Sequence, residues 1–190
     1  ITMNGLKGLT NKQGKELIPP TYDYMEDFWT NEGLEVEMNG KFGVVDTNGN
    51  IILPIIYDQI YYLGDEITAA KINGKWGYVL KGGVELTPFK YDEVYNYLGE
   101  YKNGLAKVKL NSKWFFIDTK GKEIFADKYD DVLFPSEGLI AACYKGKWGY
   151  IDMEDSVVIP FQFNDAGSFR DGNLAVVKID EHYSLIDKTG

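Results

Sequence analysis

The chain has 190 residues, of which 44% are hydrophobic and 26% are charged, a composition typical of a globular protein with a sizeable core. Its net charge of −9 argues against partners that need a basic surface, namely nucleic acid and anionic membranes. The single cysteine excludes a disulfide framework and a cysteine-based metal site, and the longest apolar runs are too short for membrane insertion.

A seven-residue motif recurs along the whole chain. It is clearest at residues 146–152, Gly-Lys-Trp-Gly-Tyr-Ile-Asp, and it returns at 40–46, 74–80 and 112–118, with weaker copies at 5–11 and 181–187. The fourth position of the motif falls at Gly8, Gly43, Gly77, Phe115, Gly149 and Ser184, so the copies are 34 to 38 residues apart. A period of this size predicts tandem repeats, here within one domain spanning residues 1–190. Because the chain begins at Ile1, and starts and stops within a repeat, we expect it to be a piece of a longer protein.

Each repeat is predicted to contain a β-hairpin. Before the motif, apolar and charged residues alternate, as over residues 34–38, which is typical of a half-buried strand. Two residues then intervene, Asn39 and Gly40 in one of the cleanest copies. Asn-Gly between alternating segments is the strongest short signal for a hairpin turn, because both residues accept a positive φ. The motif is therefore the predicted second strand.

The glycine within the motif strand indicates that another group approaches the backbone closely. We expect an aromatic ring of a neighbouring repeat to lie over Gly43, Gly77 and Gly149. One copy of the motif has Phe115 at this position instead, which predicts a local difference in packing.

The rest of the repeat is predicted to be a turn, a short strand and a loop. The turn Asp-x-x-Gly, as at 46–49, suits a type I turn whose Asp caps the backbone. A short apolar strand ending in proline follows, as at 51–54, and then a Tyr-Asp pair, as at 57–58, which we expect to hydrogen-bond to its own backbone. With no helical periodicity of useful length in the sequence, the fold class is predicted to be all-β.

These features together resemble the WG (or KWG) repeat family of bacterial proteins. The features are the motif itself, the Asp-x-x-Gly turn, the Ile-x-Pro strand and the Tyr-Asp pair, and the resemblance is most specific around Trp76 and Trp148. It covers nearly the whole chain. The resemblance implies tandem β repeats, a bacterial origin and frequent secretion or display at the cell surface. It implies no catalytic activity and carries no functional residues over to this chain.

Two architectures are compatible with such repeats. About five sets of strands could surround an axis as the blades of a β-propeller, which would remove most exposed sheet edges. The alternative is an open β-solenoid of the same repeats. We expect the propeller-like arrangement.

The sequence lacks a catalytic or metal-binding constellation. Acidic pairs such as 130–131 recur once in each repeat, whereas a catalytic site is normally made once. Cys143 is expected on an outward face, and His182 is the only histidine. A calcium loop starting at Asp46 is disfavoured, because Ile51 and Tyr57 replace the required glycine and glutamate. We therefore expect no enzyme activity, no metal and no cofactor.

Aromatic residues in the loops after the Tyr-Asp pairs are the candidate binding residues. They do not follow the repeat as regularly as the motif does, and loops on a rigid scaffold often carry binding chemistry. They are Trp29, Tyr61, Tyr62, Tyr95, Tyr97 and Tyr101. We expect them to share one face and to contact a protein or a glycan, in a non-catalytic binding or scaffold module. The alternative is a purely structural spacer in a secreted or surface protein.

Overall fold

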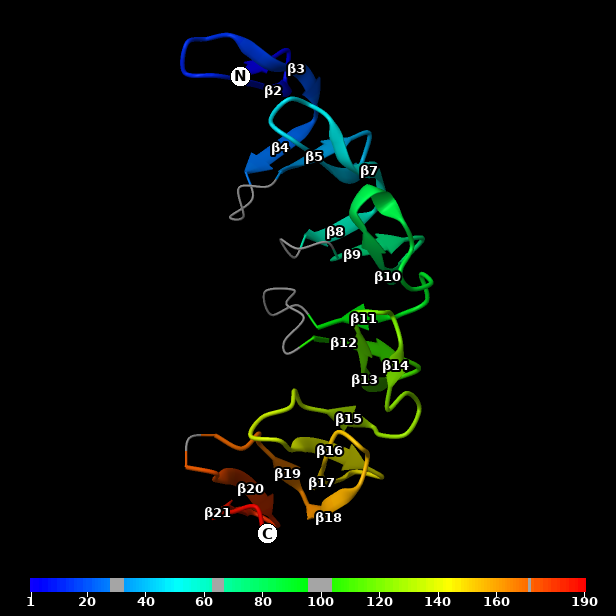
Figure 1. Ribbon diagram of the computed structural model, residues 1–190, viewed down its shortest axis with the longest axis vertical. Coiled ribbons are helices and arrows are strands. Elements are labelled where there is room, and N and C mark those ends of the chain that lie inside the picture. The colour runs from blue at the N-terminus through cyan, green and yellow to red at the C-terminus, as the bar shows by residue number, and fades with distance from the viewer. Residues whose placement is uncertain (28–32, 63–66, 96–103, 171) are drawn as a thin grey trace. The chain divides into compact units, whose positions relative to one another are not determined.

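The computed structural model describes residues 1–27, 33–62, 67–95, 104–170 and 172–190. Among these residues, Ile1–Asp92 form one compact unit, and Glu93–Tyr95 with the described residues from Gly104 to Gly190 form another. Six small antiparallel sheets build the described part of the chain, three in each unit, and most of their strands are labelled in Figure 1.

The first unit contains three sheets, each formed by strands that are consecutive in the chain. The first sheet consists of β1 (Thr2–Met3), β2 (Leu6–Thr10) and β3 (Glu16–Tyr22). The second consists of β4 (Tyr24–Asp27), β5 (Leu34–Met38), β6 (Lys41–Val45) and β7 (Ile51–Tyr57). The third consists of β8 (Gln59–Tyr62), β9 (Ile67–Ile72) and β10 (Lys75–Leu80), followed by the 3-10 turn η1 (Lys81–Gly83).

The second unit repeats the same plan. Its first sheet consists of β11 (Glu93–Val94), β12 (Leu105–Leu110), β13 (Lys113–Asp118) and β14 (Glu123–Ile124). The next consists of β15 (Asp131–Val132), β16 (Ile140–Tyr144), β17 (Lys147–Ile151) and β18 (Val157–Phe163). The last consists of β19 (Asp165–Ala166), β20 (Ala175–Ile179) and β21 (His182–Ile186). Six small antiparallel sheets of consecutive strands, with tandem repeats, make the fold all-β, so the predicted class is confirmed. Closure of the sheets into a ring stays a prediction.

The hairpin of each repeat turns as predicted from its sequence. Asn39 and Gly40 have φ values of 54° and 72°, and Lys145 and Gly146 have 51° and 75°. Two successive residues with positive φ match the twist of the flanking strands. The turn therefore joins β5 to β6, and β16 to β17, with the motif in the second strand.

Three of the strands that precede the motif, β9, β12 and β16, are buried on both faces over much of their length, which corrects the expectation of half-buried strands there, whereas β5 and β20 alternate as predicted. Ala141 and Ala142 point to opposite faces of β16 and are 1% and 0% exposed, and even Lys107 on β12 is only 6% exposed. The reason is that successive sheets in a unit pack against each other: Tyr150 of one sheet and Val177 of the next belong to one core cluster. A strand between two such layers must bury both of its faces.

The space over Gly43 and Gly149 is taken mainly by the next strand of the same sheet, and the space over Gly77 by Phe89, which lies outside the strands. A Cβ at Gly149 would meet the Ile159 oxygen at 2.7 Å and the Phe161 nitrogen at 2.9 Å, where β18 bulges away from regular pairing with β17. A phenylalanine ring does approach Gly149 and Gly77, but Ile55 takes that place over Gly43. The expectation of an aromatic ring over every motif glycine is thus only partly right.

The local difference at Phe115 is confirmed. Phe115 is 1% exposed, and the strand that follows it, β14, is shortened to two residues that pair with Phe116 and Ile117. With a large side chain in place of glycine, a long bulged strand like β18 has no room to cross at this position.

Candidate functional site

The Tyr-Asp pairs have a structural role in each repeat. In three repeats this Asp, or the Asn that replaces it, is the single residue between the last strand of one sheet and the first strand of the next: Asp23 after β3, Asp58 after β7 and Asn164 after β18. The carboxylate of Asp23 accepts a hydrogen bond from the Asn39 N–H in the hairpin turn (2.8 Å), and Asp130 accepts one from the Gly146 N–H (3.0 Å). Asn164 does the same for the Asp180 N–H in the last repeat (2.8 Å). The predicted structural role is confirmed, although the bond reaches the hairpin turn of the sheet that follows.

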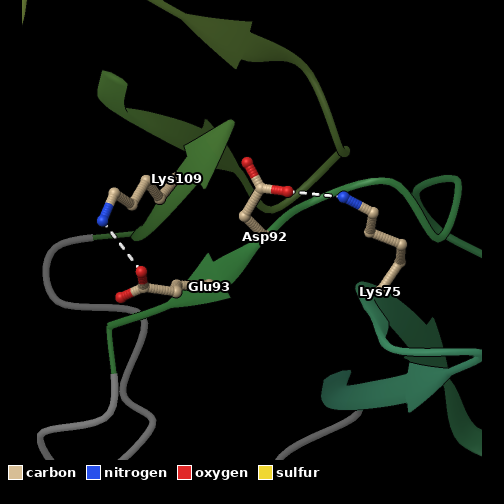
Figure 2. A network of polar contacts seen from close by, with 4 residues as sticks. All are labelled: Lys75, Asp92, Glu93 and Lys109. Atoms are coloured by element: carbon tan, nitrogen blue, oxygen red, sulfur yellow. Dashed lines mark hydrogen bonds and ion pairs between the residues drawn. The ribbon is translucent and has the colours of Figure 1, made fainter. Parts of the chain in front are cut away.

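The lysine of the motif reaches the same Asp from the preceding sheet. Lys41 Nζ lies 2.5 Å from Asp58 Oδ1, and Lys75 Nζ lies 2.5 Å from Asp92 Oδ1, as Figure 2 shows for the second pair. The hydrogen bond from Lys41 contributes most to holding the pKa of Asp58 below its usual value. Solvent-exposed pairs of this kind are worth little in free energy, so they contribute little to stability.

The second residue of the acidic pair makes an ion pair of its own. Glu93 follows Asp92 in the chain and pairs with Lys109 on the adjacent strand β12, with 2.8 Å between Oε1 and Nζ (Figure 2). Each of the two acids has its own lysine, so their recurrence is explained by the architecture of the repeat.

The Asp-x-x-Gly turns close on their own side chains. Asp46 Oδ1 accepts hydrogen bonds from the Asn48 and Asn50 backbone N–H groups, both at 2.8 Å, and Oδ2 accepts one from Asn50 Nδ2 at 2.7 Å. The side-chain bond from Asn50 is the largest of the effects that lower the pKa of Asp46. The turn chemistry predicted from the sequence accounts for both oxygens. No group of three or more potential metal ligands occurs within the described ranges.

Cys143 is buried, which corrects its expected outward position. It is 8% exposed, and burial raises the pKa of its thiol. A protonated thiol is a poor nucleophile.

The candidate binding residues divide into those that the structure describes and those that it does not. Trp29, Tyr97 and Tyr101 lie outside the described residues, and for Tyr62 only the backbone is described, in β8. The description of side chains therefore rests on Tyr61 in the first unit and Tyr95 in the second. The prediction that all six residues share one face stays a prediction.

Tyr61 and Tyr95 occupy the same position of the repeat, four residues after Tyr57 and Tyr91. Tyr61 pairs with Ala69, and the Tyr95 N–H donates to the carbonyl of Lys107, which stands at the place of Ala69 in its repeat. The other repeats have Glu26, Leu133 and Gly167 at this position, so the aromatic residue itself does not follow the repeat. Each ring contacts the motif tryptophan of its own repeat.

Tyr61 covers its tryptophan. The two rings stack with their centroids 4.7 Å apart and 14° between their planes, and Trp76 is only 5% exposed. The Tyr61 hydroxyl also accepts a hydrogen bond from Gln59 Nε2 (2.9 Å). Offset-stacked rings that exclude water from a buried tryptophan are a core contact. Tyr61 is therefore placed as a cover of the core in its repeat.

The ring of Tyr95 makes edge contacts with its aromatic neighbours, and the residue remains 46% exposed. Its ring meets Trp114 at 6.5 Å between centroids with an interplanar angle of 83°, and Phe134 at 5.7 Å with an angle of 63°. Two edge contacts hold the ring from one side and leave a large part of it in solvent. Tyr95 is the only candidate with a described side chain that offers this much aromatic surface.

Lys107 lies beneath this exposed ring, and sequence reasoning did not single it out. Its Nζ is 4.9 Å from the centroid of Trp114, 5.5 Å from that of Tyr95 and 2.7 Å from Asp131 Oδ1. Burial lowers the pKa of Lys107, and Asp131 partly offsets this. The available signal was a lysine where two other repeats have Ala69 and Ala141. The surface made by Tyr95, Trp114, Phe134, Lys107 and Asp131 is called the Tyr95 surface below.

Comparison with models of known protein families shows to which family the chain belongs. The model of the WG containing repeat matches five consecutive segments, residues 8–42, 42–76, 76–114, 114–148 and 148–183. These matches cover most of the sequence. The chain belongs to the WG repeat family. The segments run from one motif tryptophan position to the next, so a WG repeat begins in the motif strand of one sheet and ends in the motif strand of the following sheet.

Comparisons with individual proteins add the fold alone. No curated protein sequence matches this WG repeat chain. A crystal structure of a eukaryotic initiation factor is similar with a TM-score of 0.50 and 11% identity, covering 94% of this chain and 56% of that one. Kluyveromyces lactis Hsv2p has a TM-score of 0.44 and 12% identity, covering 91% and 64%. The extracellular domain of a B. thetaiotaomicron one-component system has a TM-score of 0.42 and 13% identity, covering 89% and 28%. The WG repeat chain thus spans less than two thirds of each of these proteins.

One further finding concerns membranes. Over the part of the chain that the structure describes, no helix is both long and apolar enough to cross a bilayer.

Proposed function

We propose that this WG repeat chain is a non-catalytic binding module that contacts its partner, a protein or a glycan, through the Tyr95 surface. The observation that carries the proposal is the Tyr95 ring, which is 46% exposed although Trp114 and Phe134 hold it in place. A fixed aromatic ring with an accessible side loses little conformational entropy when a partner covers it.

The charges around the ring favour the same classes of partner. Lys107 is neutralised by Asp131 at 2.7 Å, and the whole chain carries a net charge of −9. A polyanion would be repelled by such a chain, whereas a neutral sugar or a basic protein surface would not. In this proposal the acidic residues of the repeats hold the sheets together and take no part in catalysis.

A structural spacer is the second candidate, and Tyr61 favours it. At the same repeat position, this ring lies flat on Trp76 and completes the core. If the loop aromatics serve only to cover tryptophans, replacing either tyrosine should reduce stability and neither should affect a partner.

The test begins with glycan and protein arrays probed with the intact chain, followed by titration of a confirmed ligand with variants. Tyr95→Ala should weaken that ligand by about 30-fold or more, the scale of an interface hot spot, while its melting temperature stays near that of the parent. Tyr144→Ala is the matched control, because Tyr144 is a 38% exposed tyrosine at the hairpin end of β16. Equal affinity of Tyr95→Ala and the parent chain for the ligand would place the contact elsewhere.

A further inference from the structure

Tyr61 and Tyr95 hold the same position of the repeat, but their rings meet the motif tryptophan in different ways. Tyr61 stacks on Trp76 with 14° between the ring planes, and Trp76 is only 5% exposed. Tyr95 meets Trp114 at 83° and remains 46% exposed. Equivalent residues of one chain therefore take two ring positions, so the cause lies in their neighbours.

The neighbour that differs is the residue beside the tyrosine on the central strand. Tyr61 pairs with Ala69, whereas the Tyr95 N–H donates to the carbonyl of Lys107 (2.9 Å). The alanine side chain ends at Cβ and leaves the tryptophan ring open to the tyrosine. The lysine side chain instead reaches the tryptophan, with its Nζ 4.9 Å from the ring centroid, within the range of a cation–π contact.

The contacts of the two tryptophans show what Lys107 replaces. In both repeats another lysine of the preceding strand lies over the motif tryptophan, Lys71 at 5.4 Å and Lys109 at 5.5 Å from the ring centroid. Beyond this shared contact, one tryptophan carries the ring of Tyr61 and the other carries the ammonium of Lys107. Lys107 and a stacked tyrosine are thus alternative second groups over the tryptophan.

A third repeat agrees with this relation. Leu133 stands at the position of the two tyrosines, and Ala141 stands beside it on the central strand. Leu133 packs against the core cluster that contains Ala141, as Trp148 does. In both repeats with alanine on the central strand, the side chain at this position therefore lies on the core.

Stability does not account for the lysine. Lys107 is 6% exposed, burial lowers its pKa, and its partner Asp131 lies 2.7 Å away. A buried ion pair is often no more stabilising than apolar residues in its place. Ala69 and Ala141 at the equivalent positions show that the repeat folds without the charge. A role at the surface above the lysine is the explanation that remains.

We propose that Lys107 is the positioning residue of the Tyr95 surface: its side chain fills the place beside Trp114 and thereby keeps the Tyr95 ring off the core and open to a partner. The inference rests on the proposed function for the role of this surface. The position of the ring, however, can be measured without any ligand.

The test is hydroxyl-radical footprinting of the intact chain, with oxidation located to single residues by mass spectrometry. In the parent chain Tyr95 should be oxidised faster than Tyr61. Lys107→Ala should lower the rate at Tyr95 to that of Tyr61, because the ring can then stack on the tryptophan. Lys107→Arg keeps length and charge and should retain the parent rate. Lys109→Ala is the matched control, because it removes the other lysine over the same tryptophan, and it too should retain the parent rate.

Four outcomes would contradict the proposal. One is an unchanged rate at Tyr95 in Lys107→Ala, and two others are an equal fall in Lys107→Arg or in Lys109→Ala. The fourth concerns Phe134, which lies 5.7 Å from Tyr95 between ring centroids. If Phe134→Leu changes the rate at Tyr95 and Lys107→Ala does not, Phe134 positions the ring.

The variants are checked for folding by circular dichroism melts. Lys107→Ala should melt no earlier than the parent, because the Asp131 side chain that it leaves is 33% exposed and stays hydrated. Lys107→Val is a second short side chain, the one that Val176 provides in the last repeat, and it should give the same footprint as Lys107→Ala.

A confirmed ligand of the Tyr95 surface separates this proposal from the proposed function. Lys107→Ala should weaken that ligand by about 30-fold or more, as Tyr95→Ala does. The double variant should bind no more weakly than either single variant, because both changes act through one ring. Additive losses would make Lys107 a direct contact and contradict a positioning role. If Lys107→Ala changes the footprint while Tyr95→Ala leaves affinity intact, Lys107 positions the ring and the proposed function is wrong.

Discussion

Replacing Gly149 with alanine tests how the motif glycine is used. The added Cβ would lie 2.7 Å from the Ile159 oxygen and 2.9 Å from the Phe161 nitrogen, against about 3.5 Å for comfortable contact. Both are backbone atoms of β18, so a side-chain rotation cannot relieve the contact and the bulged strand must move. We expect about 2–3 kcal/mol of strain, the upper part of the range for overpacking. A reduced entropy of the unfolded chain returns about 0.4–1 kcal/mol of this.

The expected net loss is about 2 kcal/mol, or a fall in melting temperature of roughly 4–8 °C for a chain of this length. Urea and thermal midpoints measure it. Gly167→Ala is the control in the same unit, because its Cβ would lie 3.5 Å from the Val176 oxygen, an ordinary contact. Gly77→Ala should be milder than Gly149→Ala, because its nearest obstruction is the Phe89 ring at 3.0 Å. If Gly149→Ala and Gly167→Ala have the same midpoints, the close crossing of β18 over β17 does not constrain this position.

Three further changes are expected to be measurable. Burial, and then the nearby Glu26 and Glu37, raise the pKa of Glu35 to about 6, so the ionised carboxylate costs stability above that pH and protonation removes the cost as the pH falls. Glu35→Gln should therefore stabilise the chain by about 1 kcal/mol at pH 7.5, after allowance for solvent screening, and by almost nothing at pH 4; an equal gain at both values would contradict this sign. Asp130→Ala should cost about 1 kcal/mol by removing the acceptor of the Gly146 N–H, while Asp130→Asn should match the parent in denaturant midpoint, as Asn164 does this work in the last repeat. Melts with chelator and with added calcium should overlay, because the Asp46 oxygens already accept bonds from their own turn; a calcium-dependent rise of several degrees would show a bound ion.

The local structure of the repeat was accessible from the sequence because local chemistry determines it. Asn39 and Gly40 tolerate the positive φ that a tight hairpin needs, and Asp46 caps its own turn, so each signal acts within a few residues. The period of the motif then led to tandem repeats and to the family. These parts of the fold depend on little beyond neighbouring residues.

The parts that sequence reasoning missed depend on contacts between strands and sheets. The burial of Cys143 and Lys107 follows from sheets that cover both faces of a strand, which no alternation along that strand reveals. The backbone of β18 over Gly149 follows from a bulge whose position depends on how two strands pair. Both effects depend on tertiary contacts between residues that are far apart in the sequence.

Tyr61 and Tyr95 occupy equivalent positions of two repeats, but their rings are oriented differently because the residue beside them on the central strand differs. Ala69 leaves room for Tyr61 to lie flat on Trp76. In the next repeat Lys107 takes that place and puts its Nζ within 5.5 Å of Tyr95, whose ring stands on edge. One substitution on a central strand therefore separates a ring that covers the core from a ring that meets the solvent.

The single residue between successive sheets has a consequence for how such chains can diversify. Asp23, Asp58 and Asn164 each join two strands directly, and an insertion there would displace a whole sheet. The connections at the other end of the hairpin are tolerant: four residues separate β8 from β9, and ten separate β11 from β12. In these three repeats, length changes are therefore expected in the longer connection and not at the single-residue joint. A library built on this scaffold should randomise the connections between the first two strands of a sheet, such as β8 to β9, and keep the single-residue joints fixed. New sequence in these connections can be accepted without displacing a sheet.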